Sequence, residues 1–444
     1  MKLQIVLLLS SLLAAPFSTA GQYSKYDLLT EKYFEYRERL KSQFMLCMGN
    51  GPGCSLPASI RNSYDENYNG RETIKWGDGT IDLGIYISVL ATEFKLLNEE
   101  KKSTKETLHE LYYALEAFNR LDYFGDTCFG MPASLNGFFI RSDAGAGLFN
   151  NPQQTQETFF RLNSSGREVN NISSEFLNYL KGDIKLFAMS KDQVFILLMA
   201  MKLITLYIPE NIHSSSGKFL DGETSFSKEA KNIAGRMIGW IHPAGQSNFF
   251  TNWKIRTPSG GKVKAGSNAW TYSPLLSETL KNISGIKNPN QRGLSWMMAG
   301  AIREFSWFAY KPIFFFNRSE SFKTLLMETL AGKKKNMADK FFRRSRAFSP
   351  YHWYLIPLLY GCLNNSWPVN FDWKFYELLL QEAPPEGPHY FTEQGYASRQ
   401  WSSTSLIIHP RRTTHDVPHF PGSYNGLDYM LLYNLFLIGS RMVE

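Results

Sequence analysis

Residues 81–97 read IDLGIYISVLATEFKLL, and their apolar side chains recur at helical spacing on more than one side. One stripe consists of Leu83, Tyr86, Ile87, Leu90, Phe94 and Leu97, and the other side carries Ile81, Ile85, Val89 and Leu96. A helix that is apolar all round is buried on both faces. Residues 194–207, 351–363 and 424–438 share this character.

Other helical segments carry a single apolar stripe. Residues 106–121 do so, while Lys105, Glu106, Glu110 and Glu116 remain polar, so this helix is expected to show one face to water. Residues 26–44 and 226–241 follow the same pattern, and residues 373–380 are expected to lie outside as well. With helices at 273–283, 293–308 and 319–331, the chain has about eleven helices and few strand-like stretches.

The alternation of the two helix types predicts an all-α fold. Inner helices that pack on both neighbours, covered by outer ones, are what an (α/α) toroid of about five to six helical hairpins requires. We therefore expect residues 21–444 to form one toroid domain, with long loops on one rim. The alternatives are a generic helical globule and a solenoid of helix pairs, but a solenoid needs a repeat of fixed period and none is present.

Residues 1–20 have the form of a secretory signal. Lys2 precedes an apolar run, and small residues lead up to a cleavage point near Ala20. No later run reaches the roughly 18 apolar residues that a spanning helix needs. We expect a secreted or periplasmic protein with no transmembrane segment.

Four cysteines follow the signal, and an exported protein can oxidise them. Cys47 and Cys54 are the best candidates for a disulfide, because they flank a short glycine-rich turn. The alternative is that all four remain thiols. Because no CxxC motif or Cys/His cluster is present, we expect no metal site.

The charge balance and the absent motifs exclude several classes of protein. The net charge of +8 is spread along the chain, which argues against a dedicated nucleic-acid binder. No P-loop, dinucleotide fingerprint or GxSxG motif is present, and we expect no cofactor. Aromatic residues make up 15% of the chain, a high share that is common in secreted sugar-handling proteins.

Long connections rich in Gly, Asn and Ser occupy residues 48–78, 123–189, 242–270 and 382–424. In a ring they gather on the rim where the inner helices begin, and long loops in compact domains are usually functional. Three helix starts carry an aspartate, namely Asp82, Asp192 and Asp428. Two carboxylates that face one cleft can divide the acid and base roles of glycoside hydrolysis. The alternative is that each aspartate caps its own helix.

Several residues in or beside these connections are candidates for sugar contact, because flat rings stack on sugar faces and polar groups bind hydroxyls. The predicted substrate-binding set is Trp76, Asp78, Trp253, Arg256, Trp270, His352 and Tyr424. Trp253 and Trp270 bracket a cationic run that suits an acidic glycan if it forms an exposed flap. A solvated hairpin and ordinary core packing of the aromatics are the competing interpretations.

With Asp82, Asp192 and Asp428 at the starts of two-faced helices, the chain resembles the six-hairpin (α/α) toroid glycosidase superfamily over most of residues 25–440. The resemblance is architectural, and it implies hydrolysis of an oligo- or polysaccharide, with acidic glycans as one class. Members such as the unsaturated glucuronyl hydrolases place acid/base aspartates at inner-helix starts. A polysaccharide lyase on the same scaffold and a non-catalytic glycan-binding or surface-assembly protein remain as alternatives. Neither the glycan nor the oligomeric state follows from the sequence.

Overall fold

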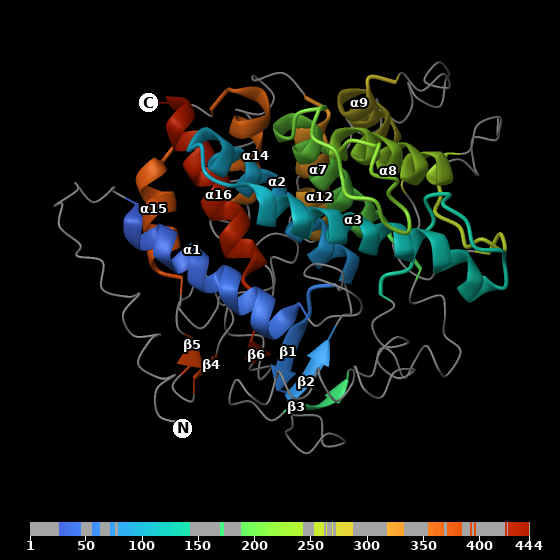
Figure 1. The fold of residues 1–444 in the computed structure, drawn as a ribbon, viewed down its shortest axis with the longest axis horizontal. Helices are drawn as coiled ribbons and strands as arrows, with labels where there is room; N and C mark the ends of the chain where they lie inside the picture. Colours follow the sequence, from blue (N-terminus) through green and yellow to red (C-terminus); the bar gives the residue numbers. More distant parts are fainter. Residues whose placement is uncertain are drawn as a thin grey trace, which may run out of the picture.

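A computed structural model of the chain describes residues 26–45, 56–62, 72–75, 79–142, 169–172, 188–242, 253–261, 263, 269, 272–286, 318–332, 354–367, 371–383, 391–392, 395–396, 422–423 and 425–443. Helices dominate these residues, which confirms the prediction of a largely helical protein (Figure 1). Their bounds are α1 Asp27–Arg39, α2 Gly79–Glu99, α3 Lys105–Gly125, α7 Lys191–Tyr207, α8 Phe226–Ile241, α9 Ser273–Ser284, α12 Arg318–Leu330, α14 Leu355–Asn364, α15 Trp373–Gln381 and α16 Leu427–Val443. A π-helical turn, η1 (Leu40–Phe44), extends α1, and a 3-10 turn, η3 (Asp126–Phe129), follows α3. The helix expected at 293–308 lies outside the described residues.

Helices α2, α7 and α16 form the centre of the core. Each is buried on all sides, as their all-round apolar sequences predict; in α7 every residue from Gln193 to Met201 is buried. α2 packs on both α7 and α16. The contact with α7 is close, because a Cβ added to Gly84 would lie 2.9 Å from Cγ2 of Ile196.

These three helices run in the same direction. Gly84 and Ile196, which lie side by side, are the sixth residues of α2 and α7. Asn434, in the middle of α16, donates hydrogen bonds to Val89 O and Thr92 Oγ1 of α2. Near the end of α16, Arg441 pairs with Glu100, which directly follows α2. The three helices therefore begin at the same end of the molecule.

Two more helices connect α7 back to α16. α12 packs on α7 and on α14, and α14 packs on α16. In the last of these contacts the Cys362 thiol lies 3.4 Å from Leu435 O, and Trp367, just past α14, lies against Gly439 near the end of α16. The packing of α2, α7, α12, α14 and α16 thus forms a closed circuit, in which the last helix contacts the first.

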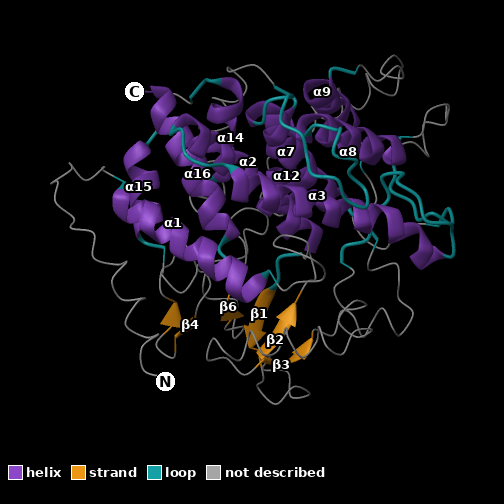
Figure 2. Ribbon diagram, in the orientation of Figure 1, coloured by secondary structure: helices purple, strands orange, loops and turns teal. Residues whose placement is uncertain are grey.

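The remaining helices pack on members of this circuit, and Figure 2 shows α1 and α15 on the left of the view and α8 and α9 on the right. α3 packs on α2, α8 packs on α7 and α9, and both α1 and α15 pack on α16. α3 runs antiparallel to α2, since Thr107 near its start bonds Glu93 far along α2. α8 has the single apolar stripe that its sequence predicts, with Ala230, Ile233, Met237 and Ile241 buried.

The prediction that Glu110 and Glu116 face water on α3 is wrong. Glu110 is only 3% exposed and accepts hydrogen bonds from two other helices. Glu116 is half-buried and accepts the backbone N–H groups of Phe219 and Leu220, at 2.9 and 2.7 Å. The helix pattern marks these positions as polar, but it does not reveal that partners from other segments cover them.

Small strands complete the fold. The order in the main sheet is β3 (Val169–Ile172), β2 (Glu72–Lys75), β1 (Ser59–Asn62) and β6 (Gly422–Ser423), with β2 and β3 parallel and the other pairs antiparallel. β4 (Phe391–Thr392) and β5 (Gly395–Tyr396) form a separate pair. The main sheet joins three of the four long connections and lies at one end of the helices (Figure 1). Because β2 and β6 directly precede α2 and α16, this is the end where the central helices begin.

Candidate active site at the start of the central helices

The three predicted catalytic aspartates lie at the same end of adjacent helices. Asp82, Asp192 and Asp428 occupy the first turns of α2, α7 and α16. Because these helices are parallel and α2 contacts both others, the three positions share one end of the core. Asp82 and Asp192 are half-buried, and Asp428 is 9% exposed.

Other residues supply caps at two of the three helix starts. At α7, Gln193 Oε1 accepts the N–H of Ser190 at 2.9 Å, half of a capping box. At α16, Asn425 Oδ1 accepts the N–H of Leu427 at 3.3 Å. The residue that would cap α2, Asp78, lies outside the described residues. Capping therefore does not account for the aspartate at position 192.

Asp192 is held instead by a lysine from another helix. Lys323 of α12 places its Nζ 2.9 Å from Asp192 Oδ1. Lys323 is only 7% exposed and is flanked on α12 by buried Phe322 and Leu326, whereas 23% of the Asp192 side chain is exposed. The pair thus joins a buried ammonium to a partly exposed aspartate, whose Oδ1, the oxygen that faces Lys323, is buried.

Aromatic and cationic groups adjoin this pair. The Lys191 ammonium lies 5.6 Å from the centre of the Tyr272 ring, within the range of a cation–π contact. Tyr272, which directly precedes α9, also packs on Phe195 of α7 with ring centres 4.9 Å apart. The start of α7 therefore combines two ammonium groups, a carboxylate and a tyrosine.

Trp253 packs on a neighbouring side chain. Its ring stacks on His242 with centres 4.6 Å apart and planes 10° apart, and its backbone has a φ of 60°. Burial lowers the pKa of His242, which favours the neutral ring. Arg256 is exposed, and its carbonyl accepts the indole N–H of Trp240 at 3.1 Å. The described contacts link Trp253 and Arg256 to the end of α8 and not to the three aspartates.

Several predicted residues lie outside the part of the chain that the structure describes. They are Trp76, Asp78, Trp270, His352, Tyr424 and the cysteines Cys47 and Cys54. The predicted signal, residues 1–20, does so too. Of the other cysteines, Cys362 is a buried thiol whose pKa is raised to about 12 by burial. A thiol in that state is a poor nucleophile.

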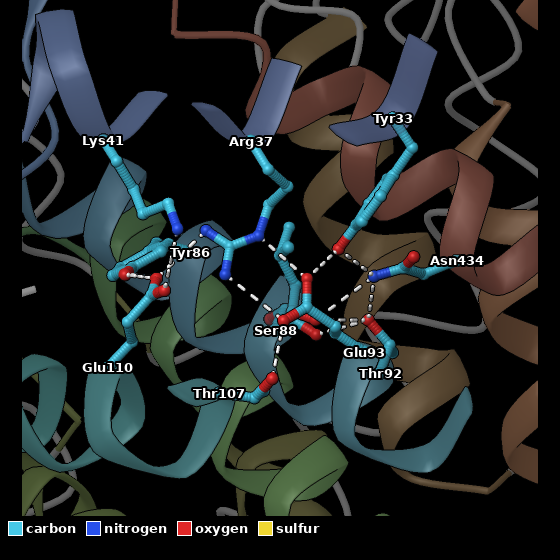
Figure 3. A network of polar contacts seen from close by, with 11 residues as sticks. Tyr33, Arg37, Lys41, Tyr86, Ser88, Thr92, Glu93, Thr107, Glu110 and Asn434 are labelled. Carbon is cyan, nitrogen blue, oxygen red and sulfur yellow. Dashed lines mark hydrogen bonds and ion pairs between the residues drawn. The ribbon is translucent and has the colours of Figure 1, made fainter. Parts of the chain in front are cut away.

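Among the described residues, a buried ionic cluster that joins three helices was not expected from the sequence (Figure 3). Arg37 of α1 lies 2.8 Å from Glu93 of α2 and 3.0 Å from Glu110 of α3. Tyr33 donates a hydrogen bond to Glu93, and Tyr86 donates one to Glu110. This cluster, which we call the Arg37 cluster, ties α1 to the α2–α3 hairpin.

Arg37 faces two carboxylates, and the half-buried Lys41, whose Nζ lies 3.9 Å from Glu110, supplies the second cation of the Arg37 cluster. Burial raises the pKa of Glu93, but the Arg37 guanidinium and hydrogen bonds from Arg37, Tyr33 and Thr107 more than offset it, so that the pKa lies below its ordinary value. Burial and the neighbouring carboxylates raise the pKa of Tyr33 and of Tyr86, which keeps both phenols protonated. Glu93 lies eleven residues beyond Asp82 on α2, about 16 Å at 1.5 Å per residue. The glutamate Glu93 of the Arg37 cluster therefore lies away from Asp82, whereas the tyrosine Tyr86 lies one helical turn beyond Asp82 on α2.

Two further properties of the described residues bear on function. These residues contain no group of three His, Cys, Asp or Glu side chains placed to hold a metal ion. None of the described helices combines the length and apolar character needed to cross a membrane. Comparison of the chain with known protein families, with curated proteins and with solved structures found no match.

Proposed function

We propose that this chain is a secreted glycoside hydrolase whose core is an (α/α) toroid. The closed circuit of α2, α7, α12, α14 and α16, with other helices packed on its members, supports the toroid. A ring of this kind has a rim where its parallel inner helices begin, and the main sheet joins three long connections at that rim. Secretion rests on the signal-like character of residues 1–20.

The observation that carries the proposed activity is the common placement of Asp82, Asp192 and Asp428. Glycoside hydrolysis needs one carboxyl group to protonate the leaving oxygen and a second to activate water or attack the sugar. Three aspartates in the first turns of adjacent parallel helices offer such a set. The proposal requires two of these carboxyl groups to lie roughly 5–10 Å apart across an open cleft.

The test is a screen of the purified protein against neutral and acidic oligosaccharides, followed by Asp82→Asn, Asp192→Asn and Asp428→Asn. We expect cleavage of at least one glycan and a loss of about 10²–10⁴-fold in kcat for two of the three variants, because acid/base groups contribute on that scale.

Asp372→Asn is the matched control. Asp372 caps the outer helix α15 by accepting the N–H of Phe375 at 3.0 Å, and asparagine is an equally good cap. If the wild type cleaves a glycan and all three rim variants keep its rate, the catalytic assignment is wrong.

A polysaccharide lyase is the second candidate, and the Lys191–Tyr272 contact favours it. A lyase removes a proton beside the uronate carboxylate, for which a tyrosine near cationic groups is suited. Its products carry a new double bond and absorb ultraviolet light, whereas hydrolysis products do not. A protein that binds the glycan and yields neither product would be a binding module.

A further inference from the structure

The end of α8 carries two partly exposed indole rings. Trp240, in the last turn of α8, is half-buried, and its Nε1 donates to Arg256 O at 3.1 Å. Trp253 is half-buried too, and its ring lies nearly parallel to that of His242, with centres 4.6 Å apart. Because His242 is only 7% exposed, it covers one face of this indole from the protein interior. Both indoles therefore have a supported position and some aromatic surface that a ligand can contact.

The backbone holds Trp253 in a conformation that is rare for a large side chain. Its φ of 60° lies in the left-handed region, which a bulky residue adopts only when the surrounding structure imposes it. The N–H of Trp253 donates to Ile241 O at 3.1 Å, and its carbonyl accepts the N–H of Ala269 at 2.9 Å. Strained positions of this kind cluster at functional sites. The strain therefore indicates that the placement of this ring serves a purpose beyond packing.

Two cationic side chains follow Trp253 in the sequence. Lys254 and Arg256 are exposed, whereas Ile255 and Thr257 are buried. This alternation is that of an extended segment, so both cations lie on its outer side. None of the described residues forms an ion pair with either of them. The two charges are therefore available to an anion.

A short segment joins this part of the molecule to the rim where the central helices begin. The ring of Phe138 packs on Trp240 with centres 5.4 Å apart. Three residues later, Arg141 O lies 2.9 Å from the position of a Cβ added to Gly79, the first residue of α2. Three residues span at most about 10 Å at 3.3 Å per residue. The indoles therefore lie beside the rim, where a polymer bound at the rim can also contact them.

We propose that the two indoles and the two cations form one binding surface for an acidic polysaccharide, outside the bond that is cleaved. This set, which we call the α8 surface, consists of Trp240, Trp253, Lys254 and Arg256. Indoles stack on the faces of sugar rings, and exposed cations attract the carboxylate or sulfate groups of such a polymer. The inference rests on the proposed function, and it adds the class of substrate and a second place where the substrate is held.

Aromatic rings beside cations also bind single-stranded nucleic acid. The signal-like residues 1–20 favour the polysaccharide, because an exported protein is separated from the nucleic acids of the cell. Biolayer interferometry on immobilised polymers at physiological ionic strength distinguishes these ligands. The polymers are polygalacturonate, which carries carboxylates, dextran sulfate, which carries sulfates, neutral dextran and a single-stranded DNA. We expect the wild type to bind at least one acidic polysaccharide about tenfold more tightly than dextran and the DNA.

Two variants test the α8 surface. Lys254→Gln/Arg256→Gln removes both charges and keeps the hydrogen bond from Trp240, because the backbone carbonyl of Arg256 accepts it. Trp253→Ala removes one of the indoles. For each variant we expect about tenfold weaker binding to the acidic polysaccharide, because exposed ion pairs and aromatic stacking each contribute on that scale.

Lys105→Gln/Lys228→Gln is the matched control for the change in charge. It removes two exposed cations at the starts of α3 and α8. Lys228 lies twelve residues before Trp240 on α8, about 18 Å at 1.5 Å per residue. This variant is expected to keep the wild-type Kd, and an equal loss of binding in both double variants would overturn the inference.

The inference is also overturned if the wild type binds neither acidic polysaccharide, if the DNA binds as tightly as they do, or if Lys254→Gln/Arg256→Gln keeps the wild-type Kd. The last result leaves the proposed hydrolase intact when the wild type cleaves a glycan. Binding that depends on the α8 surface, without cleavage of any glycan, supports the inference and contradicts the proposed function alone. If circular dichroism shows that Trp253→Ala does not fold, the charge variant, in which only exposed side chains change, still decides the inference.

Discussion

At the scale of single residues, the sequence predicts an environment that neighbouring residues create and does not predict one that distant segments create. The aspartates at positions 82, 192 and 428 were predicted to lie at helix starts, and they lie in the first turns of α2, α7 and α16. This prediction was possible because a polar residue before an apolar run is a local signal of a helix start. Glu93 and Glu110 carry no such signal, since a glutamate on a helix is usually exposed. Their partner, Arg37, lies 56 residues before Glu93, so the Arg37 cluster could not be inferred from local pattern.

The Arg37 cluster predicts an acid-sensitive contribution to stability. The folded-state pKa of Glu93 lies below the ordinary value of 4.5, so its contribution is present above about pH 4.5 and is lost as the pH falls through the folded pKa. We expect Glu93→Gln to lower the Tm clearly at pH 7 and by less at pH 3. Thermal unfolding followed by circular dichroism measures both.

Glu106→Gln is the control for this measurement, because Glu106 is an exposed residue in the first turn of the neighbouring helix α3. Its Tm is expected to follow that of the wild type at both pH values. A difference between Glu93→Gln and the wild type that is as large at pH 3 as at pH 7 would contradict the assignment of a charged Glu93.

At the scale of elements, the helices were predictable and the strands were not. Helices such as α2 and α8 contain enough turns for an apolar period to repeat, and the predicted bounds agree with the observed ones to within a few residues. β6 has two residues and pairs with β1, more than 350 residues earlier in the chain. Such a strand is too short to show alternation, and its pairing depends on the fold that brings the segments together.

The contact between α14 and α16 depends on two glycines. Trp367 fills the space beside Gly361 and Gly439, where an added Cβ on either residue would overlap its ring. We expect Gly361→Ala and Gly439→Ala each to lower the free energy of unfolding by about 1–3 kcal/mol through overpacking. Urea denaturation, with Trp367 among the fluorescent side chains, provides the measurement.

Gly235 and Gly239 of α8 provide matched controls. A Cβ at either position meets no atom within 4 Å, so alanine there adds only helix propensity. Gly235→Ala and Gly239→Ala should raise the free energy of unfolding by up to about 1 kcal/mol. Should Gly439→Ala behave like them, the tryptophan does not occupy this slot.

At the scale of the whole molecule, the sequence predicts which helices are buried on two sides, but it does not predict which helix contacts which in the closed circuit. That order depends on contacts such as Lys323 with Asp192 and Cys362 with Leu435, which join distant parts of the chain. The three aspartates lie at the same end of the core because their helices run in the same direction, and that direction is known from the packing of the helices. The residues that complete the predicted binding set lie outside the described part of the chain, so that set stays a prediction.

A closed circuit of helices predicts cooperative unfolding that an open array would not show. In a solenoid each unit contacts only its neighbours, so the two ends can open separately. Here α16, near the end of the chain, contacts α2 through Asn434, whose Nδ2 donates to Val89 O at 3.2 Å and to Thr92 Oγ1 at 3.0 Å. Asn434→Ala leaves those buried acceptors without this donor, at a cost of about 1–3 kcal/mol.

Hydrogen exchange measured by mass spectrometry can tell the two architectures apart. In a closed ring we expect Asn434→Ala to lower protection by a similar free energy in α2, α7, α12 and α16, because opening one contact releases the whole circuit. Asn232→Ala, which removes an Nδ2 contact of 3.3 Å to Glu229 on the outer helix α8, should change exchange in α8 alone. If Asn434→Ala loosens α16 and α2 while α7 and α12 keep wild-type protection, the helices behave as an open array. The rim on which the aspartates are proposed to converge would then lack the closed support that the toroid requires.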